Sequence, residues 1–365
     1  MELQKIHVTL IGQIDPQGTN TGGIEVHLNE LIRHLEAKGI DTLVLGWTSQ
    51  RCKDDNFIPI LRNKKLTGIR YLISLILKAP FVDIPENSII HGHRPDHILP
   101  FIWRKNAIIC TLHGAHILNV KLKWGRLAEF IYSIVQTIAL KRADLIIYVS
   151  EWTRRFFHKR HPFLVRKKYV VISPGVKNTF RPSDEKGGRG YYLPQIREND
   201  RLLIYVGRLE KEKNIDRLIE QVKGSRYQLL IVGEGREEKK LRKAKKGYSN
   251  IVFTGCVSHE KVPSLINAAD AAVLLSEYEG MPIFVLESLA CGKPVLSSDV
   301  GDIRRLILDG KTGYIVNGAN FMKYAEKLFS EDYNRFRKNC LAASKEHMWD
   351  SVGDRIIQAY KTLGI

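Results

Sequence analysis

The chain has 365 residues, of which 44% are hydrophobic, and it carries a formal net charge of +18. This length exceeds one ordinary α/β domain and suits two domains, each with a sizeable core. The five cysteines stand singly, without a C-x-x-C pair, so neither a disulfide framework nor a zinc site is expected and a cytoplasmic protein is predicted.

The positive charge is concentrated in the first half of the chain. Residues 1–182 contain 27 Lys and Arg against 14 Asp and Glu, whereas residues 183–365 contain 30 against 25. Such a field favours phosphate groups, acidic lipid surfaces or nucleic acid as partners. Because no recognisable nucleic-acid-binding module is present, nucleic acid is not expected. The longest apolar runs are too short for a membrane span, and no signal peptide is predicted before the first strand.

Short β-branched runs alternate with amphipathic helical patterns along the whole chain. In the first half, strands are predicted at Ile6–Ile11, Thr42–Leu45, Ile89–His91, Ala107–Leu112, Leu145–Val149 and Val170–Ile172. In the second half, strands are predicted at Arg201–Val206, Gln228–Val232, Ile251–Phe253, Ala272–Leu275, Pro294–Ser297 and Gly313–Val316. Short apolar strands with helical crossovers predict two α/β domains, each a doubly wound, Rossmann-like parallel sheet.

The domain boundary is predicted near residue 182. Apolar periodicity lapses there, and proline and glycine cluster at Ser173–Gly175, Arg181–Pro182 and Gly187–Gly190. The expected organisation is a first domain over residues 1–182, a second over residues 183–345, and a C-terminal helical segment over residues 346–365.

A loop containing several glycines, Gly12–Glu25, joins the first predicted strand to a helix. It is too long for a G-x-G-x-x-G fingerprint, but its Gly22-Gly23 pair at the helix start would let the backbone approach a ligand closely. A flexible loop without a ligand is an equal interpretation of this segment taken alone.

Histidines gather near the ends of two predicted strands, at His91, His93, His97, His113 and His116. His113 follows a strand directly, at the edge of the sheet where ligands of open α/β domains bind. A single histidine more often has a structural role, and no carboxylate or cysteine joins this group at metal-ligand spacing. No metal site is therefore predicted.

The segment Val206–Asn214 follows the first strand of the second half. Arg208 offers a planar guanidinium and Lys213 a mobile ammonium, which are the two usual phosphate-binding groups. An exposed charged loop is the alternative interpretation, because Lys211 and its acidic neighbours have that composition.

A second turn follows the strand Ala272–Leu275 and leads into a helix near Pro282, a residue suited to a first helical turn. The backbone N–H groups of Gly280, Met281 and Ile283 would then form an anion-binding helix start.

Two acids flank this helix start. Glu279 lies just before it, and Glu287 lies roughly two turns further along. Acids placed in this way can accept hydrogen bonds from separated hydroxyl groups of one extended ligand. Taken singly, Glu279 is more simply a helix-capping residue and Glu287 a solvated helical residue.

The spacing Glu279-x7-Glu287, the downstream run Leu286-Glu-Ser-Leu-Ala-Cys-Gly-Lys-Pro-Val295 and the Gly207-Arg208…Glu212-Lys213 pattern closely resemble the signature of glycosyltransferase family 4. The resemblance covers nearly the whole chain and is most specific over residues 201–317. Met281-Pro282 is a departure, because many members have Phe-Gly there. The resemblance implies a GT-B fold, with two Rossmann-like domains facing each other across a cleft and the segment 346–365 crossing back as a helix onto the first domain.

The resemblance also implies the role of each site residue. In the second domain, Glu279 would contact the donor sugar, Glu287 the ribose hydroxyls, and Arg208 and Lys213 the diphosphate. The other implied donor contacts are Gly22 and Gly23 at the phosphate, His113 near the transferred sugar, the backbone near Val257 at the base, and the helix start at Gly280, Met281, Pro282 and Ile283.

The predicted activity is transfer of a hexose-type sugar from a UDP- or GDP-sugar, with retention of configuration, to a hydroxyl group of a lipid-linked, polysaccharide or glycoconjugate acceptor. The catalytic residues would be His113, Glu279, Arg208 and Lys213. Because no D-x-D motif is present, no metal and no other cofactor is expected. A GT-B phosphorylase, a nucleotide-sugar epimerase and an inactive scaffold are the alternatives, and a role in cell-envelope polysaccharide synthesis is the expected setting.

Two basic, apolar segments, residues 61–81 and 154–168, predict peripheral attachment to an anionic membrane surface on its cytoplasmic side. The alternative for each is an ordinary solvated helix whose apolar face belongs to the core. The oligomeric state is not predicted.

Overall fold

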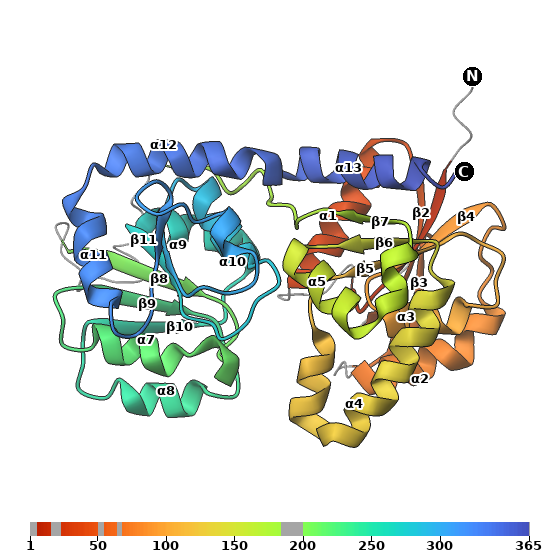
Figure 1. The fold of residues 1–365 in the computed structure, drawn as a ribbon, viewed down its shortest axis with the longest axis horizontal. Coiled ribbons are helices and arrows are strands. Elements are labelled where there is room, and N and C mark those ends of the chain that lie inside the picture. The colour runs from red at the N-terminus through yellow and green to blue at the C-terminus, as the bar shows by residue number, and fades with distance from the viewer. Residues whose placement is uncertain (1–5, 16–22, 50–54, 64–67, 184–199, 365) are drawn as a thin grey trace. The chain divides into compact units, whose positions relative to one another are not determined.

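The computed structural model describes residues 6–15, 23–49, 55–63, 68–183 and 200–364. They form two compact units (Figure 1): unit 1 is residues 1–175 with 349–365, and unit 2 is residues 176–348. The predicted boundaries were residues 182 and 345. Val176 already belongs to unit 2, because it pairs with Met348 and its N–H donates to the carbonyl of His347. The Gly187–Gly190 stretch lies outside the described residues.

Unit 1 is built on a seven-stranded parallel sheet with the strand order β3-β2-β1-β4-β5-β6-β7. The strands are β1 (His7–Ile11), β2 (Asp41–Thr48), β3 (Phe57–Arg62), β4 (Ser88–Gly92), β5 (Ile108–Leu112), β6 (Leu145–Tyr148) and β7 (Tyr169–Val171). The α-helices are α1 (Gly23–Ala37), α2 (Gly68–Lys78), α3 (Pro95–Ile98), α4 (His116–Arg142), α5 (Glu151–Arg160) and α13 (Trp349–Lys361).

Strand β3 was not predicted from the sequence. Pro59 lies in its middle, and a proline argues against a strand because it cannot donate a ladder hydrogen bond. The position of β3 at the edge of the sheet accommodates the proline, because only one side of an edge strand pairs with a neighbour.

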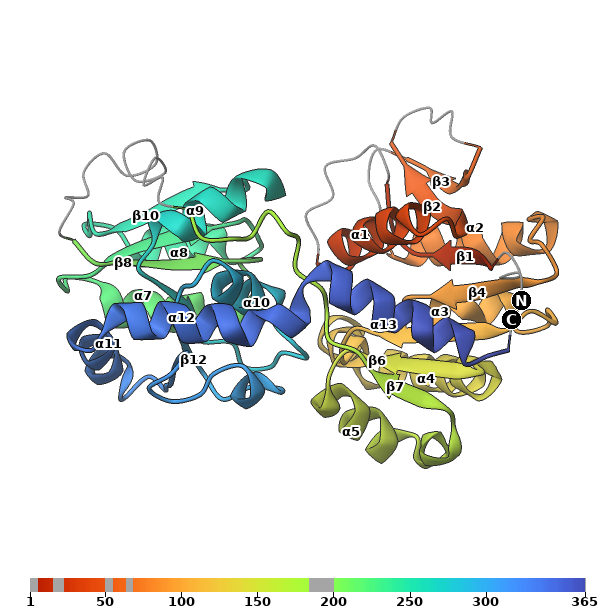
Figure 2. The same cartoon turned by 90° about the horizontal axis from the view of Figure 1, so that it is seen from above.

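The C-terminal helix α13 packs on unit 1 beside α1 (Figure 2). Its residues Trp349, Val352, Ile356 and Tyr360 recur at helical spacing and join a core cluster with the strands of the sheet. Arg355 adds a hydrogen bond of 2.8 Å from its guanidinium to the carbonyl of Val171.

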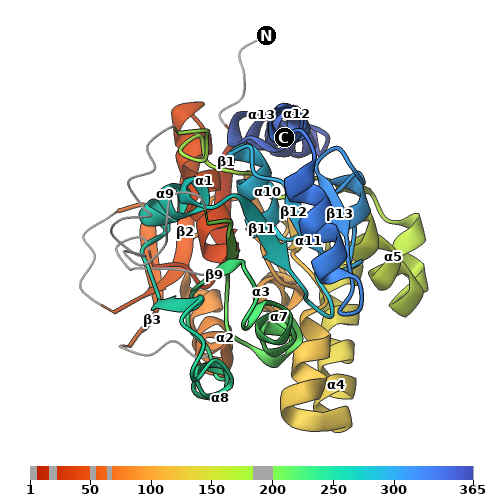
Figure 3. The same ribbon diagram turned by 90° about the vertical axis from the view of Figure 1, so that its left-hand side faces the viewer.

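Unit 2 is built on a six-stranded parallel sheet with the order β10-β9-β8-β11-β12-β13. Strands β9, β11, β12 and β13 of this sheet are labelled in Figure 3. The strands are β8 (Leu202–Val206), β9 (Gln228–Val232), β10 (Ile251–Gly255), β11 (Ala271–Leu274), β12 (Val295–Ser297) and β13 (Gly313–Ile315). The α-helices are α7 (Ile215–Val222), α8 (Glu238–Ala244), α9 (Val262–Ala268), α10 (Ile283–Ala290), α11 (Phe321–Ser330) and α12 (Tyr333–Ser344). One continuous core spans the sheet and these helices.

Both sheets have a topological switch point, where successive crossovers leave in opposite directions. It lies between β1 and β4 in unit 1 and between β8 and β11 in unit 2. Ligands of doubly wound domains bind beyond the carboxyl ends of the strands at such a point. Among the described residues, no helix is long and apolar enough to cross a membrane.

Candidate functional site

The two charged turns of unit 2 meet at its switch point. One turn follows β8 and contains Lys213, and the other follows β11 and contains Glu279. The turns are joined by the backbone N–H of Glu277, which donates to the carbonyl of Glu212 at 2.7 Å. Asn214, in the left-handed conformation with φ of 50°, donates its side-chain amide to the carbonyl of Leu275 at 3.0 Å. The strand order therefore brings together motifs that are far apart in sequence.

Lys213 and Glu279 form an ion pair, with 2.5 Å between Nζ and Oε1. Each side chain is only 15% exposed, and the hydroxyl of Ser276 donates to the same carboxylate oxygen at 2.8 Å. Helix α10 has no side-chain hydrogen bond at its N-cap, Pro282, so the interpretation of Glu279 as a helix cap is wrong. A charge-assisted pair of this kind fixes the positions of both side chains.

The first turn of α10 presents backbone N–H groups that have no intrahelical partner. The turn before it comes very close to Gly301, where a Cβ atom would lie 2.3 Å from the carbonyl oxygen of Glu279. With a φ of 56°, Gly301 also has a backbone that other residues rarely adopt. Position 301 therefore requires glycine. Gly280 and Met281 are half-buried and Pro282 is buried, next to the predicted anion-binding start at Ile283.

Glu287 is buried and paired. It is 5% exposed, and Nε2 of His259 lies 2.8 Å from its Oε1. The interpretation of Glu287 as a solvated helical residue is therefore wrong. The His259 ring also packs on Phe180, with 5.2 Å between ring centroids.

Sequence reasoning missed His259. It begins the short helix η5 (His259–Lys261), two residues after the half-buried Val257, and nothing in the local sequence marks it as the partner of Glu287. The only available signal was its position close to the predicted base-binding turn.

Arg208 is exposed, like Lys211, so the structure does not bring it into the Lys213–Glu279 pair. The backbone of Arg208 is fixed, because the hydroxyl of Tyr205 donates to its carbonyl oxygen at 3.0 Å. Burial, followed by the charge of Glu279, raises the pKa of Tyr205 well above its usual value, so this hydroxyl remains a donor.

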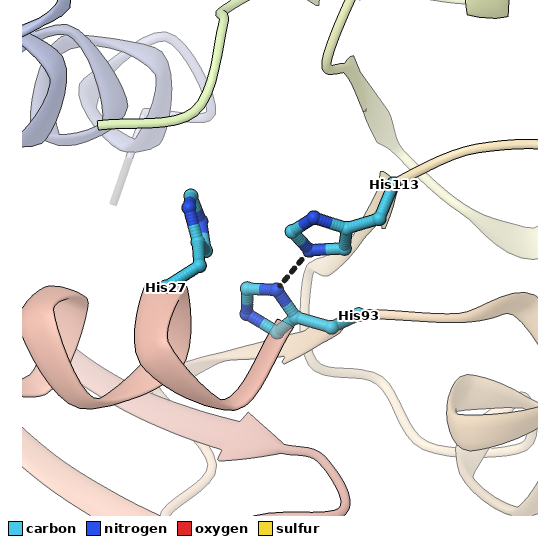
Figure 4. Close-up of side chains that lie close together, drawn as sticks. All are labelled: His27, His93 and His113. Carbon is cyan, nitrogen blue, oxygen red and sulfur yellow. Dashed lines mark hydrogen bonds between the residues drawn. The ribbon is translucent and has the colours of Figure 1, made fainter. Parts of the chain in front are cut away.

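In unit 1, His93 follows β4, His113 follows β5, and His27 projects from α1 toward both (Figure 4). Nδ1 of His93 and Nε2 of His113 share a hydrogen bond of 2.9 Å. Gly23 is the exposed first residue of α1, and Gly22 lies outside the described residues.

Of the five histidines that lie near the two strand ends in the sequence, only His93 and His113 belong to this cluster. His91 bonds to Thr111 and Tyr360, while the rings of His97 and His116 pack against Tyr71 and Tyr132. His27 could not be added to this group from the sequence, because it lies on a different element.

Burial keeps the histidine rings neutral. It lowers the pKa of His27 to about 4 and, followed by the effect of His27, that of His91 to about 3. It also lowers the pKa values of His93 and His113 well below the usual value, and the neighbouring histidines add to the shift.

Comparisons with known proteins agree with this architecture. Residues 194–343 match the family described as glycosyl transferases group 1, and residues 21–179 match Glycosyltransferase Family 4. The chain is 25% identical to a phosphatidyl-myo-inositol mannosyltransferase from Mycobacterium leprae, and the match covers 97% of this chain and 96% of that one.

Solved structures show the same fold. Sucrose-phosphate synthase from Thermosynechococcus elongatus matches with a TM-score of 0.81 and 19% identity over 98% of both chains. Anabaena HepE, solved in complex with UDP-glucose, matches with a TM-score of 0.74 and 17% identity over 98% of this chain and 99% of that one.

Two doubly wound domains of this kind define the GT-B class of transferases. The chain belongs to glycosyltransferase family 4, the glycosyl transferases group 1, and is therefore an enzyme that transfers a sugar.

Proposed function

We propose that this glycosyltransferase moves a hexose-type sugar from a nucleotide diphosphate, UDP or GDP, to an acceptor hydroxyl with retention of configuration. The observation that carries the proposal is the Lys213–Glu279 pair beside the N-terminus of α10 at the unit 2 switch point. Cation, carboxylate and free N–H groups in one place suit a ligand that joins a sugar to a diphosphate. The complex of Anabaena HepE with UDP-glucose supports a donor of this class.

Each donor part has a proposed partner in unit 2. The diphosphate binds Arg208, Lys213 and the N–H groups of Gly280, Met281 and Ile283, while Glu279 accepts hydrogen bonds from the sugar. Glu287, held by His259, accepts from the ribose hydroxyls. The backbone near Val257 binds the base.

Two further contacts come from unit 1. Gly23, the first residue of α1, approaches the phosphate, and His113 contacts the transferred sugar as a neutral imidazole, because burial lowers its pKa.

The proposed reaction is a front-side displacement that needs no metal. The bond from the sugar to the diphosphate breaks, the acceptor hydroxyl adds to the same face, and an oxygen of the leaving diphosphate takes the acceptor proton. Negative charge grows on the diphosphate during this step. Arg208, Lys213 and the α10 N-terminus stabilise it, which is the role that a metal ion has in other transferases.

The test is a panel of UDP-, GDP- and ADP-sugars offered with a mixed set of hydroxyl acceptors in EDTA. We expect a glycosidic product with the donor's anomeric configuration by NMR, formed together with one nucleoside diphosphate. A sugar 1-phosphate would indicate a phosphorylase, an altered donor sugar an epimerase, and nucleotide binding without product an inactive scaffold. Loss of product in EDTA with rescue by manganese would overturn metal independence.

The acceptor side is proposed to face an anionic membrane through helices α2 and α4 of unit 1, on the cytoplasmic side. Large apolar side chains are exposed on both helices, and the short helix α3 contacts both. These side chains are Ile69, Ile73, Ile76 and Leu77 on α2 and Leu122, Trp124, Leu127, Phe130, Ile131, Ile134 and Ile138 on α4. Lys121, Lys123 and Arg126 lie among the α4 residues, a combination typical of an interfacial helix.

The second predicted membrane segment fits its alternative interpretation better. Phe157 and Leu164, in residues 154–168, are buried in the unit 1 core, so the apolar part of that segment is mostly structural. A lipid-linked acceptor remains the proposal, supported by the Mycobacterium leprae relative, whose name includes a phospholipid.

Liposome co-sedimentation tests this surface. We expect binding to anionic vesicles that falls as salt rises, and loss of binding in a Leu127→Ser, Phe130→Ser variant. Val165→Ser, at an exposed apolar residue outside α2 and α4, is the control. Equal binding to neutral vesicles, or no effect of the α4 changes, would contradict the proposal.

A further inference from the structure

The unit 1 switch point holds three histidines that come from three different elements. His27 lies on α1, which follows β1, while His93 and His113 directly follow β4 and β5 (Figure 4). The ends of β1 and β4 are joined by a hydrogen bond from the N–H of His93 to the carbonyl of Ile11. Adjacent parallel strands therefore bring the rings together beyond the carboxyl ends of the strands, where ligands bind.

The spacing of the three rings matches one metal ion. One ring nitrogen from each lies within 4.8 Å of the other two. The ring centroid of His27 lies 5.6 Å from that of His93 and 4.9 Å from that of His113, and the centroids of His93 and His113 are 5.2 Å apart. Three imidazoles in a tetrahedral zinc site, with bonds of about 2.0–2.1 Å, have ring centroids about 5 Å apart.

One of these side chains contains buried polar atoms that call for a partner. His27 is 5% exposed, and neither of its ring nitrogens has a hydrogen-bond partner among the described residues. Buried polar atoms without partners are rare and unfavourable in folded proteins.

The ring of His93 has a fixed neighbour outside the trio. The ring of His91 packs against that of His93, with centroids 4.4 Å apart and 31° between the ring planes, and is itself fixed by Thr111 and Tyr360. This packing restricts the orientations open to the ring of His93.

We propose that His27, His93 and His113 bind one zinc ion, or a similar divalent transition metal, and leave a fourth position open. The metal takes the place of the proton in the His93–His113 hydrogen bond, and that proton moves to the other nitrogen of its ring. Both rings then remain neutral ligands. Three histidines with an open position form a well-known zinc arrangement.

The proposal does not depend on the proposed transfer reaction, although both use His113. The proposed transfer reaction needs no metal. Zinc bound to the ring of His113 would block the contact of that ring with the sugar, and zinc therefore inhibits transfer. Removal of zinc by EDTA is then expected to preserve or raise activity.

The experiment is titration of the chelator-stripped full chain with zinc by calorimetry and with cobalt by visible absorption, at pH 7.5. We expect one ion per chain and the d–d bands of four-coordinate cobalt. His27→Asn should weaken zinc binding at least about 10-fold and remove the bands. His97→Asn is the matched control, because His97 is also a buried histidine of unit 1 and lies outside the trio.

Circular dichroism checks that both variants fold, and His113→Asn replaces His27→Asn if the latter does not. Failure of the wild type to bind zinc would overturn the site. Wild-type affinity in the trio variant would also overturn it, because the zinc would then be bound adventitiously elsewhere on the surface. If zinc binds but the zinc-free chain transfers no sugar from any donor, the proposed function fails while the metal site stands.

Discussion

The two topological switch points of this chain differ in the polar side chains that they hold. In unit 2 two site carboxylates are already paired, Glu279 with Lys213 and Glu287 with His259. In unit 1 the corresponding place holds neutral histidines, of which His27 has no described hydrogen-bond partner. The carboxyl ends of the central strands therefore present charged side chains to a ligand in unit 2, and buried imidazole lone pairs in unit 1.

The difference shows how the same strand topology supports different chemistry. In unit 2 the charges of Lys213 and Glu279 are held at partial burial, so a charged ligand finds them oriented before it binds. In unit 1 deep burial suppresses protonation instead, which makes the rings weak bases and available ligands. The following predictions test this contrast, beginning with the largest expected effect.

Replacing Glu279 should cause the largest loss. Glu279→Gln removes the partner of Lys213 and the proposed sugar contact, and disruption of such a charge pair costs roughly 2–5 kcal/mol, at least about 30-fold in turnover. Calorimetry should still detect binding of the nucleoside diphosphate alone, because Glu279 faces the sugar. Loss of nucleotide binding with normal sugar transfer at saturation would reverse the proposed role.

The phosphate contacts should be next in size. Arg208→Ala and Lys213→Ala each remove a charge-assisted contact worth about 1.5–3 kcal/mol, or roughly 10- to 150-fold in nucleotide affinity. Lys211→Ala is the control, because Lys211 is an exposed neighbour in the same turn. The assignment fails if Lys211→Ala is as damaging as the other two, or if both of those retain wild-type activity.

The neutral histidines of unit 1 should make its stability depend on pH. The folded-state pKa of His27 is about 4, below its usual 6.5, so between these values the unfolded chain binds more protons. Stability is therefore fully present above about pH 6.5 and falls as the pH drops, by up to about 1.4 kcal/mol per pH unit for each such histidine.

Tryptophan fluorescence can follow this loss in unit 1 alone, because all five tryptophans lie there: Trp47, Trp103, Trp124, Trp152 and Trp349. Urea unfolding between pH 7 and pH 5 should show the decline, and His27→Asn should make it shallower. A free energy of unfolding that stays constant over this range would contradict buried, neutral histidines.

The sequence alone predicted the fold and the two turns of unit 2 that carry Lys213 and Glu279. Each predicted strand overlaps an observed one, because buried parallel strands appear as short apolar runs between helices. The two turns could be located because each directly follows a predicted strand. Strand β3 could not be predicted, since Pro59 is tolerated only by its edge position, which is a property of the sheet.

The partners of site residues were the part that could not be predicted. The sequence does not reveal that His259 is the partner of Glu287, nor that α1 brings His27 to His93 and His113. Both are tertiary contacts between distant segments. For the same reason, the apolar run of α4 could be noticed in the sequence, but its exposure could be established only in the folded unit.

The smallest expected effect concerns the second pair of unit 2. Glu287→Ala should weaken nucleotide binding itself, because Glu287 is the proposed ribose contact. His259 acts only by positioning that carboxylate, through one hydrogen bond of 2.8 Å. Loss of one such bond is worth about 0.5–1.5 kcal/mol, so His259→Ala should raise KM roughly 2- to 12-fold and leave kcat nearly unchanged.

His259→Gln should restore much of this loss, because its amide can still donate to Glu287. Glu260→Ala is the matched control, since Glu260 is the exposed neighbour of His259. If His259→Ala weakened nucleotide binding as strongly as Glu287→Ala, His259 would have to contact the ligand directly. If kcat fell while KM held, the pair would serve the chemical step instead. Either result would remove the distinction between a binding residue and the partner that orients it, on which the paired site of unit 2 depends.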